Sequence, residues 1–173
     1  DVWASPLRFW RHVMATADPR NPGAIAGLGD ALFDVSRFED AKPLFERAAA
    51  MRVREEHSLW PLSVAVNDSR LGLDFAAVSR IEQLVKAEPM WRRAAYSLVL
   101  VRARAGDFNF ARAAVGAARE RFGDDEFLRD LEQRVRDGEA GVTSPDARTR
   151  ARALHTLGAT RKAEAEYLRI DDD

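Results

Sequence analysis

The chain has 173 residues, of which 46% are hydrophobic and 32% are charged. This size and composition predict one folded domain with a hydrophobic core and exclude an intrinsically disordered chain. The 27 basic and 28 acidic residues give a net charge of -1, so no global field would recruit nucleic acid or an anionic membrane surface. Cysteine is absent, which excludes disulfides, thiolate zinc sites and a cysteine nucleophile.

A first helix is predicted within residues 1–20. Ser5 and Pro6 supply an N-cap and a proline in the first turn, as helix starts prefer. Leu7, Trp10 and Met14 then recur on one helical face. We expect a capping helix that packs on the segment after it.

Residues 21–55 predict a pair of helices. Apolar and small side chains share one face of the first helix: Ile25, Leu28, Gly29 and Leu32. Ser36 and Glu39 have the spacing of a capping box, so a second helix is expected to begin at Ser36. Pro43 lies past the first turn of that helix and predicts a kink or a later start.

A sequence period of 34 residues follows. Gly72 to Gly106 spans 34 residues, and so does Ala77 to Ala111. Ala41 to Ala77 spans 36 residues, which predicts an insertion of two residues between these helix pairs. Small residues at these positions allow two helices to approach closely.

Local signals also predict where the later helices begin and end. Asp74 and Asp107 are expected to be N-caps of second helices, since each follows a glycine turn. Acidic residues open an apolar stripe in residues 124–138, where Gly138 is expected to end the helix. Residues 144–173 reproduce the repeat spacing after a short linker and predict a degenerate terminal repeat.

The pattern in residues 21–55 resembles the tetratricopeptide repeat. Leu28 and Gly29 stand as the family's Leu-Gly pair, and Ala41 with Phe45 stands as its small-then-aromatic step. The resemblance implies an all-α fold of antiparallel helix pairs stacked in a right-handed superhelix, with about 3 to 4 repeats plus terminal capping helices. The expected domain comprises a capping helix (1–20), repeat 1 (21–55), a degenerate repeat 2 (56–90), repeat 3 (91–123), an extra helix (124–138) and the degenerate terminal repeat (144–173).

In this family the first helices of successive repeats line a concave groove that commonly binds peptides, so the resemblance implies a partner site there. Aligning the first helices by the period gives the expected site residues: Asp30, Phe33, Asp34, Leu59, Leu62, Val66, Arg70, Arg93, Tyr96, Leu100 and Arg104. Apolar side chains would supply affinity, and the acidic and basic ends would fix orientation. The alternative that Leu59, Leu62 and Val66 only pack on neighbouring helices stays open, because the insertion leaves the register of repeat 2 open by one residue.

No residue pattern indicates catalysis or a cofactor. His12, His57 and His155 lack a second ligand at metal-binding spacing, and no phosphate-binding loop follows a strand. We therefore expect no enzyme activity, no cofactor, no metal, no nucleic acid partner and no membrane partner, since no apolar run approaches the roughly 20 residues of a membrane span.

The function expected from the resemblance is a noncatalytic module that binds a protein or peptide partner in the groove. One alternative is a substrate-recognition domain from a larger bacterial enzyme, such as a glycosyltransferase or sulfotransferase, because the chain starts without Met and enzymes of this kind carry such repeats. Another is a structural scaffold that self-associates, as a homodimer for instance. We expect a cytoplasmic protein, and a periplasmic one fits the sequence as well.

Overall fold

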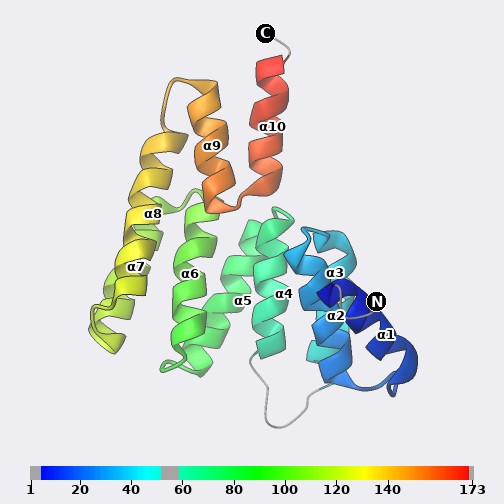
Figure 1. Ribbon diagram of the computed structural model, residues 1–173. Coiled ribbons are helices and arrows are strands. Elements are labelled where there is room, and N and C mark those ends of the chain that lie inside the picture. The colour runs from blue at the N-terminus through cyan, green and yellow to red at the C-terminus, as the bar shows by residue number, and fades with distance from the viewer. Residues whose placement is uncertain (1–4, 52–58, 172–173) are drawn as a thin grey trace. The chain divides into compact units, whose positions relative to one another are not determined.

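The computed structural model describes residues 5–51 and 59–171, and all regular structure in these residues is helical. The helices are α1 (Pro6–Thr16), α2 (Pro22–Asp34), α3 (Phe38–Ala50), α4 (Leu59–Arg70), α5 (Asp74–Ala87), α6 (Arg92–Ala105), α7 (Phe108–Phe122), α8 (Glu126–Val142), α9 (Ala147–Leu157) and α10 (Thr160–Asp171). Helices adjacent in sequence pack together, as Figure 1 shows within each unit. The all-α, repeat-like architecture expected from the sequence is thus confirmed.

The chain divides into two compact units, residues 1–67 and residues 68–173. The first unit contains α1, α2, α3 and most of α4, and the second contains the end of α4 and α5 to α10. None of the helices in the described residues is both long and apolar enough to span a membrane.

Glycines bring the helices of the first unit close together. A Cβ on Gly27 would lie 2.6 Å from the ring of Trp10, and one on Gly29 would lie 2.8 Å from the ring of Phe45. The α1–α2 and α2–α3 contacts therefore require residues without side chains at these positions. This is the packing role that the sequence predicts for Gly29.

The turn between α2 and α3 differs from the predicted capping box. Ser36 has a φ of 60°, and its N–H donates to the carbonyl of Phe33 at 2.9 Å, while the Arg37 N–H donates to that of Leu32 at 2.9 Å. These bonds satisfy carbonyls at the end of α2. Ser36 therefore ends α2 and does not cap α3, which begins at Phe38 and continues through Pro43.

Two apolar clusters form the core of the first unit. One contains Ile25, Ala26, Ala48 and Trp60, and the other contains Leu32, Ala41, Phe45 and Val64. α4 joins both clusters through Trp60 and Val64. A polar contact adds to this packing, since the buried Asn67 donates its side-chain N–H to the carbonyl of Phe38 at 3.0 Å.

A larger cluster forms the core of the second unit, built from α6, α7 and α8 with Leu157 at the end of α9. Leu157 also explains why α8 does not stop at Gly138, as the sequence led us to expect. Gly138 is buried within α8, and a Cβ there would lie 2.7 Å from the Leu157 side chain. The glycine provides room for α9, and α8 continues to Val142.

The N-cap position expected for Asp107 is confirmed in α7, whereas the one expected for Asp74 in α5 is wrong. Gly72 and Gly106 do turn the chain, with φ of 76° and 92°. However, Leu73 occupies the N-cap position of α5, and the Asp107 side chain makes no capping hydrogen bond to α7. The carboxylates of Asp74 and Asp107 instead bind basic side chains, because Lys162 and Arg102 lie within reach.

Candidate functional site

The expected groove residues of the first unit lie on α2 and α4. Asp30, Asp34 and Leu59 are exposed, while Leu62 is only 2% exposed. Leu62 therefore belongs to the interior, which corrects its expected place on a groove floor. The half-buried Phe33 and Val66 complete this set, and the Phe33 ring packs edge-on against the rings of Phe38 and Phe45.

Tyr96 of α6, expected on the groove floor, instead joins α6 to α8. Its side chain is buried, its hydroxyl donates to Asp125 Oδ2 at 2.8 Å, and its ring stacks on Phe127 at 5.3 Å between centroids. Burial, with the hydrogen bond to Asp125, raises the pKa of Tyr96 above its usual value. The half-buried Leu100 packs against the same core, and Arg93 is the exposed residue among the expected site residues of this helix.

Arg70 and Arg104 hold the end of α9. They lie 34 residues apart, at the same position of the repeat period. The Arg70 Nη1 donates to the carbonyl of Gly158 at 3.0 Å, and the Arg104 Nε donates to that of Leu157 at 2.7 Å. Carbonyls at a helix C-terminus lack partners within the helix and carry partial negative charge. The two arginines expected to orient a partner thus bind the chain's own helix.

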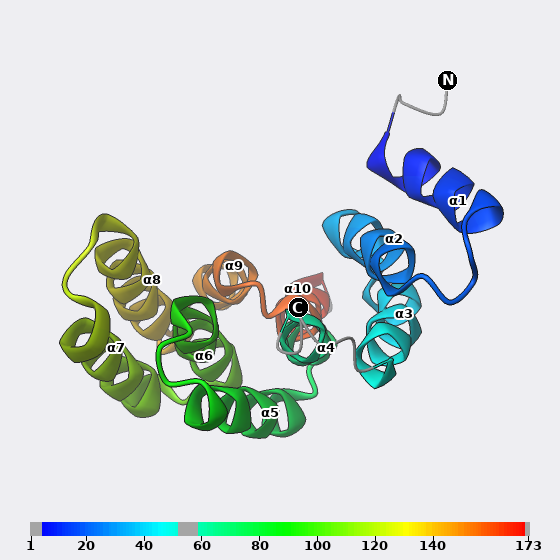
Figure 2. The ribbon, with the colours of Figure 1, turned by 90° about the horizontal axis from the view of Figure 1, so that it is seen from below.

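The first turn of α10 extends this contact. Lys162 Nζ donates to the carbonyl of Arg104 at 2.7 Å and forms an ion pair with Asp74 Oδ2 at 2.7 Å. Burial, with repulsion from Arg70, lowers the pKa of Arg104 to about 9. The α9–α10 hairpin therefore covers the side of α6 on which Arg104 lies, and Figure 2 shows α9 and α5 on opposite sides of α6.

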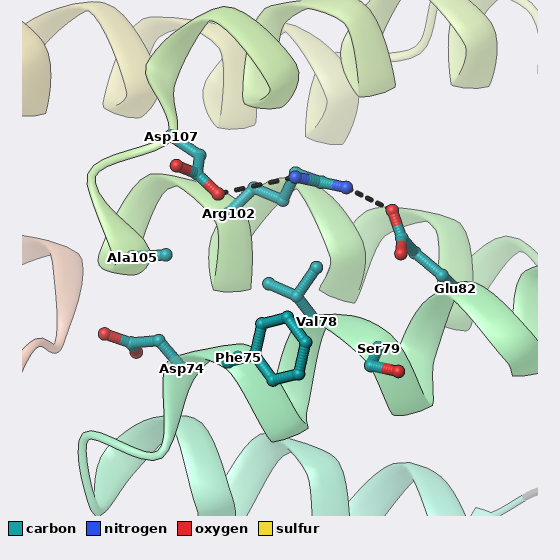
Figure 3. A pocket seen from close by; sticks show the side chains of 8 residues that line it. All are labelled: Asp74, Phe75, Val78, Ser79, Glu82, Arg102, Ala105 and Asp107. Carbon is teal, nitrogen blue, oxygen red and sulfur yellow. Dashed lines mark hydrogen bonds and ion pairs between the residues drawn. The ribbon is translucent and has the colours of Figure 1, made fainter.

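A cleft of about 410 Å³ lies beside α5 in the second unit (Figure 3). Its lining comes from α5, the end of α6 and the turn after α6: Asp74, Phe75, Val78, Ser79, Glu82, Arg102, Ala105 and Asp107. Figure 3 shows Val78 pointing from α5 toward Arg102, with the Phe75 ring beside Val78 along the same helix, and Arg102 reaching between Asp107 and Glu82. The cleft thus combines an apolar wall with a charged rim.

Arg102 is fixed within this rim. Its Nη2 forms an ion pair with Glu82, its Nη1 lies 3.4 Å from Asp107 Oδ2, and its Cζ lies 4.7 Å from the centroid of the Phe110 ring. A guanidinium held by two carboxylates and an aromatic face is restrained in position. Arg102 is therefore a fixed part of the charged rim of the cleft.

Aromatic side chains near the cleft are unusually exposed. Phe75 is 89% exposed and Phe110 is 60% exposed. Aligned on Ala41, Ala77 and Ala111, Phe75 corresponds to Glu39 and Phe110 corresponds to Asp40. The first helix pair thus carries acids at these two exposed positions, where the second unit carries phenylalanines.

Sequence reasoning missed this cleft, although a signal was present. Phe75 and Phe110 lie on second helices, and the site was expected on first helices. Comparing each exposed position across the period would have identified two phenylalanines where acids are found in the first repeat. Exposed aromatic side chains that lie together beside a cleft are typical of a binding surface.

The arrangement of the cleft can hold a segment of a partner. Phe75 and Val78 can bury an apolar side chain, and the carboxylates can accept hydrogen bonds from a partner. Within residues 5–51 and 59–171, no group of three or more His, Asp or Glu side chains is placed to hold a metal ion.

Comparisons with known proteins find no relative of this chain. The chain matches no protein-family model, and neither the curated proteins nor the solved structures contain a match to it.

Proposed function

We propose that this chain is a noncatalytic interaction module of the tetratricopeptide type that binds a peptide or a partner protein. The repeat resemblance and the stacked helix pairs support the proposal. The surface differs from the one expected from the sequence, because α9 and α10 cover the face of α6 that carries Arg104. The partner binds instead at the cleft beside α5.

The observation that carries the proposal is the exposure of Phe75. Its ring is 89% exposed on the wall of a cleft, and Phe110 is exposed nearby. Burying a phenylalanine side chain against a partner contributes roughly 1.5 to 3 kcal/mol. Aromatic side chains at the centre of an interface commonly supply much of its affinity.

A displayed library of random peptides tests the proposal directly. Enriched peptides are synthesised with a fluorescent label and titrated by anisotropy against the unaltered protein and the Phe75→Ser variant. We expect Phe75→Ser to weaken binding about tenfold or more, because the variant removes the exposed ring. Since Phe75 contributes little to the interior, the variant should stay folded, which circular dichroism checks.

Leu168→Ser is the matched control. Leu168 is 66% exposed on α10 and does not line the cleft. Its replacement should leave peptide affinity unchanged. Failure to enrich any peptide, or equal losses in the Phe75 and Leu168 variants, would count against a binding role for this cleft.

Self-association through the same phenylalanines has a distinct signature. In that case the unaltered protein would form a dimer in sedimentation experiments, and Phe75→Ser would convert it to a monomer. This result would replace the peptide-binding proposal with a homodimer.

A further inference from the structure

The cleft beside α5 carries an excess of negative charge. Three carboxylates line it, those of Asp74, Glu82 and Asp107, against the single guanidinium of Arg102. Lys162 balances Asp74 from α10, outside the lining. A carboxylate has four lone-pair sites on two oxygens, so an ion pair with Arg102 does not exhaust the capacity of Glu82 or Asp107 to accept hydrogen bonds.

The apolar part of the cleft lies between these carboxylates. Phe75 and Val78 come from α5, and Ala105 comes from the end of α6. A volume of about 410 Å³ is within the range of ligand-binding clefts. An apolar side chain that enters between Phe75 and Val78 would place its neighbours in the partner chain near the acidic rim.

Basic neighbours suit this rim better than acidic ones. Lysine and arginine have apolar stems that can cover an exposed ring while the charged group stays near water. Within the chain, Arg102 places its guanidinium over the Phe110 ring, a cation–π contact that a basic side chain of a partner can also make with an exposed phenylalanine. A partner carboxylate would instead approach Asp107 or Glu82 and be repelled.

We infer that the cleft beside α5 binds a partner segment in which an apolar side chain is flanked by lysine or arginine. The inference rests on the proposed function and adds the chemistry of the partner. It is carried by the apolar wall of Phe75 and Val78 together with the carboxylates of Glu82 and Asp107, whose two negative charges share the single guanidinium of Arg102.

Two fluorescent probe peptides of equal length test the charge preference. One contains leucines flanked by lysines, and the other contains the same leucines flanked by glutamates. By anisotropy at low salt, we expect the lysine probe to bind about tenfold tighter or more, and the difference to shrink as salt is added. Phe75→Ser retains every charge of the cleft, so it should abolish most of the lysine-probe binding.

Ser79 permits a change of charge inside the cleft without breaking an ion pair of Arg102. Ser79→Lys places a cation at the lining, so the lysine probe should bind about fivefold weaker or more and the glutamate probe tighter. Ser79→Ala alters the same position without adding charge, and both affinities should stay as in the unaltered protein.

The outcomes separate the inference from the proposed function. Equal affinity for the two probes, binding of neither, or lysine-probe binding that ignores both Phe75→Ser and Ser79→Lys would overturn the inference. Library peptides that require Phe75 but show no excess of basic residues would overturn it while leaving the binding role intact. A library without any enriched peptide would remove both.

Discussion

α5 and α7 begin at equivalent positions of the 34-residue period but are held in different ways. The first residue of α7 is Phe108, which is 8% exposed and packs into the core of the second unit. The first residue of α5 is Asp74, which forms an ion pair with Lys162 of α10. A carboxylate in place of an apolar anchor therefore gives the terminal hairpin a point of attachment.

The comparison also explains where the exposed aromatic ring lies. α3 begins with the buried Phe38, as α7 begins with Phe108. In α5 the phenylalanine comes one residue later, and a helix turns by about 100° per residue. Phe75 therefore projects outward, and Asp74 occupies the position that a buried phenylalanine has in α3 and α7. Moving the phenylalanine by one position along the helix thus places its ring on the surface instead of in the core.

Replacing the anchor itself should have the largest effect. Phe108→Ala removes a buried ring and should lower the free energy of unfolding by about 3 kcal/mol. Phe75→Ala removes an exposed ring and should change it by less than about 0.5 kcal/mol. Urea denaturation followed by circular dichroism measures both, and similar losses would show that the two phenylalanines do not differ in their contribution to the core.

The ion pair at the start of α5 should have a smaller effect. A double-mutant cycle with Asp74→Ala and Lys162→Ala should give a coupling free energy of about 1 kcal/mol, because the pair is partly exposed. The coupling should decrease as salt is added. A coupling near zero would mean that the ion pair between Lys162 and Asp74 does not stabilise the attachment of the hairpin to α5.

α8 begins in a third way, and this start should be sensitive to pH. Asp125 accepts the N–H of Leu128 at 2.7 Å and the hydroxyl of Tyr96 at 2.8 Å, and these hydrogen bonds lower the pKa of the Asp125 carboxyl. A lowered pKa in the folded state stabilises the fold above the usual carboxyl pKa, and this contribution is lost as pH falls through the lowered value.

The Asp125→Asn variant isolates this effect, since asparagine also caps helices. We expect the midpoint temperature of unfolding of this variant to be slightly lower than that of the unaltered protein at pH 7. As the pH is lowered below about 4, the midpoint temperature of the variant should fall less than that of the unaltered protein. Thermal unfolding across this pH range measures the difference. Parallel curves for the two proteins would show that Asp125 does not contribute to the acid sensitivity.

Much of the helical framework could be predicted because its signals are local. Ser5 caps α1 as expected, and glycines at 72 and 106 turn the chain with positive φ. Helix boundaries were predicted wrongly where one residue type is compatible with two different structural roles. Ser36 can begin a helix or end one, and Gly138 can stop a helix or make room for Leu157.

The candidate site could be predicted less well, since exposure depends on contacts between distant residues. Tyr96 has the spacing of a surface position on α6, but Asp125 and Phe127 cover it from α8. Phe75 was passed over because the site was expected on the first helices of the pairs, and α5 is a second helix. Neither side chain's exposure follows from its own helix alone.

By itself, the sequence determined the helical content, because apolar periodicity and glycine turns specify helices through residues that are close together in the chain. It also determined the 34-residue register, because small residues recur at that spacing. It also placed Arg70 and Arg104 at equivalent positions of this period, on α4 and α6. Only the tertiary structure decided what those arginines bind. Their acceptors are the carbonyls of Gly158 and Leu157, which lie 88 and 53 residues further along the chain at the end of α9. Only folding brings these carbonyls within hydrogen-bond distance of the two arginines.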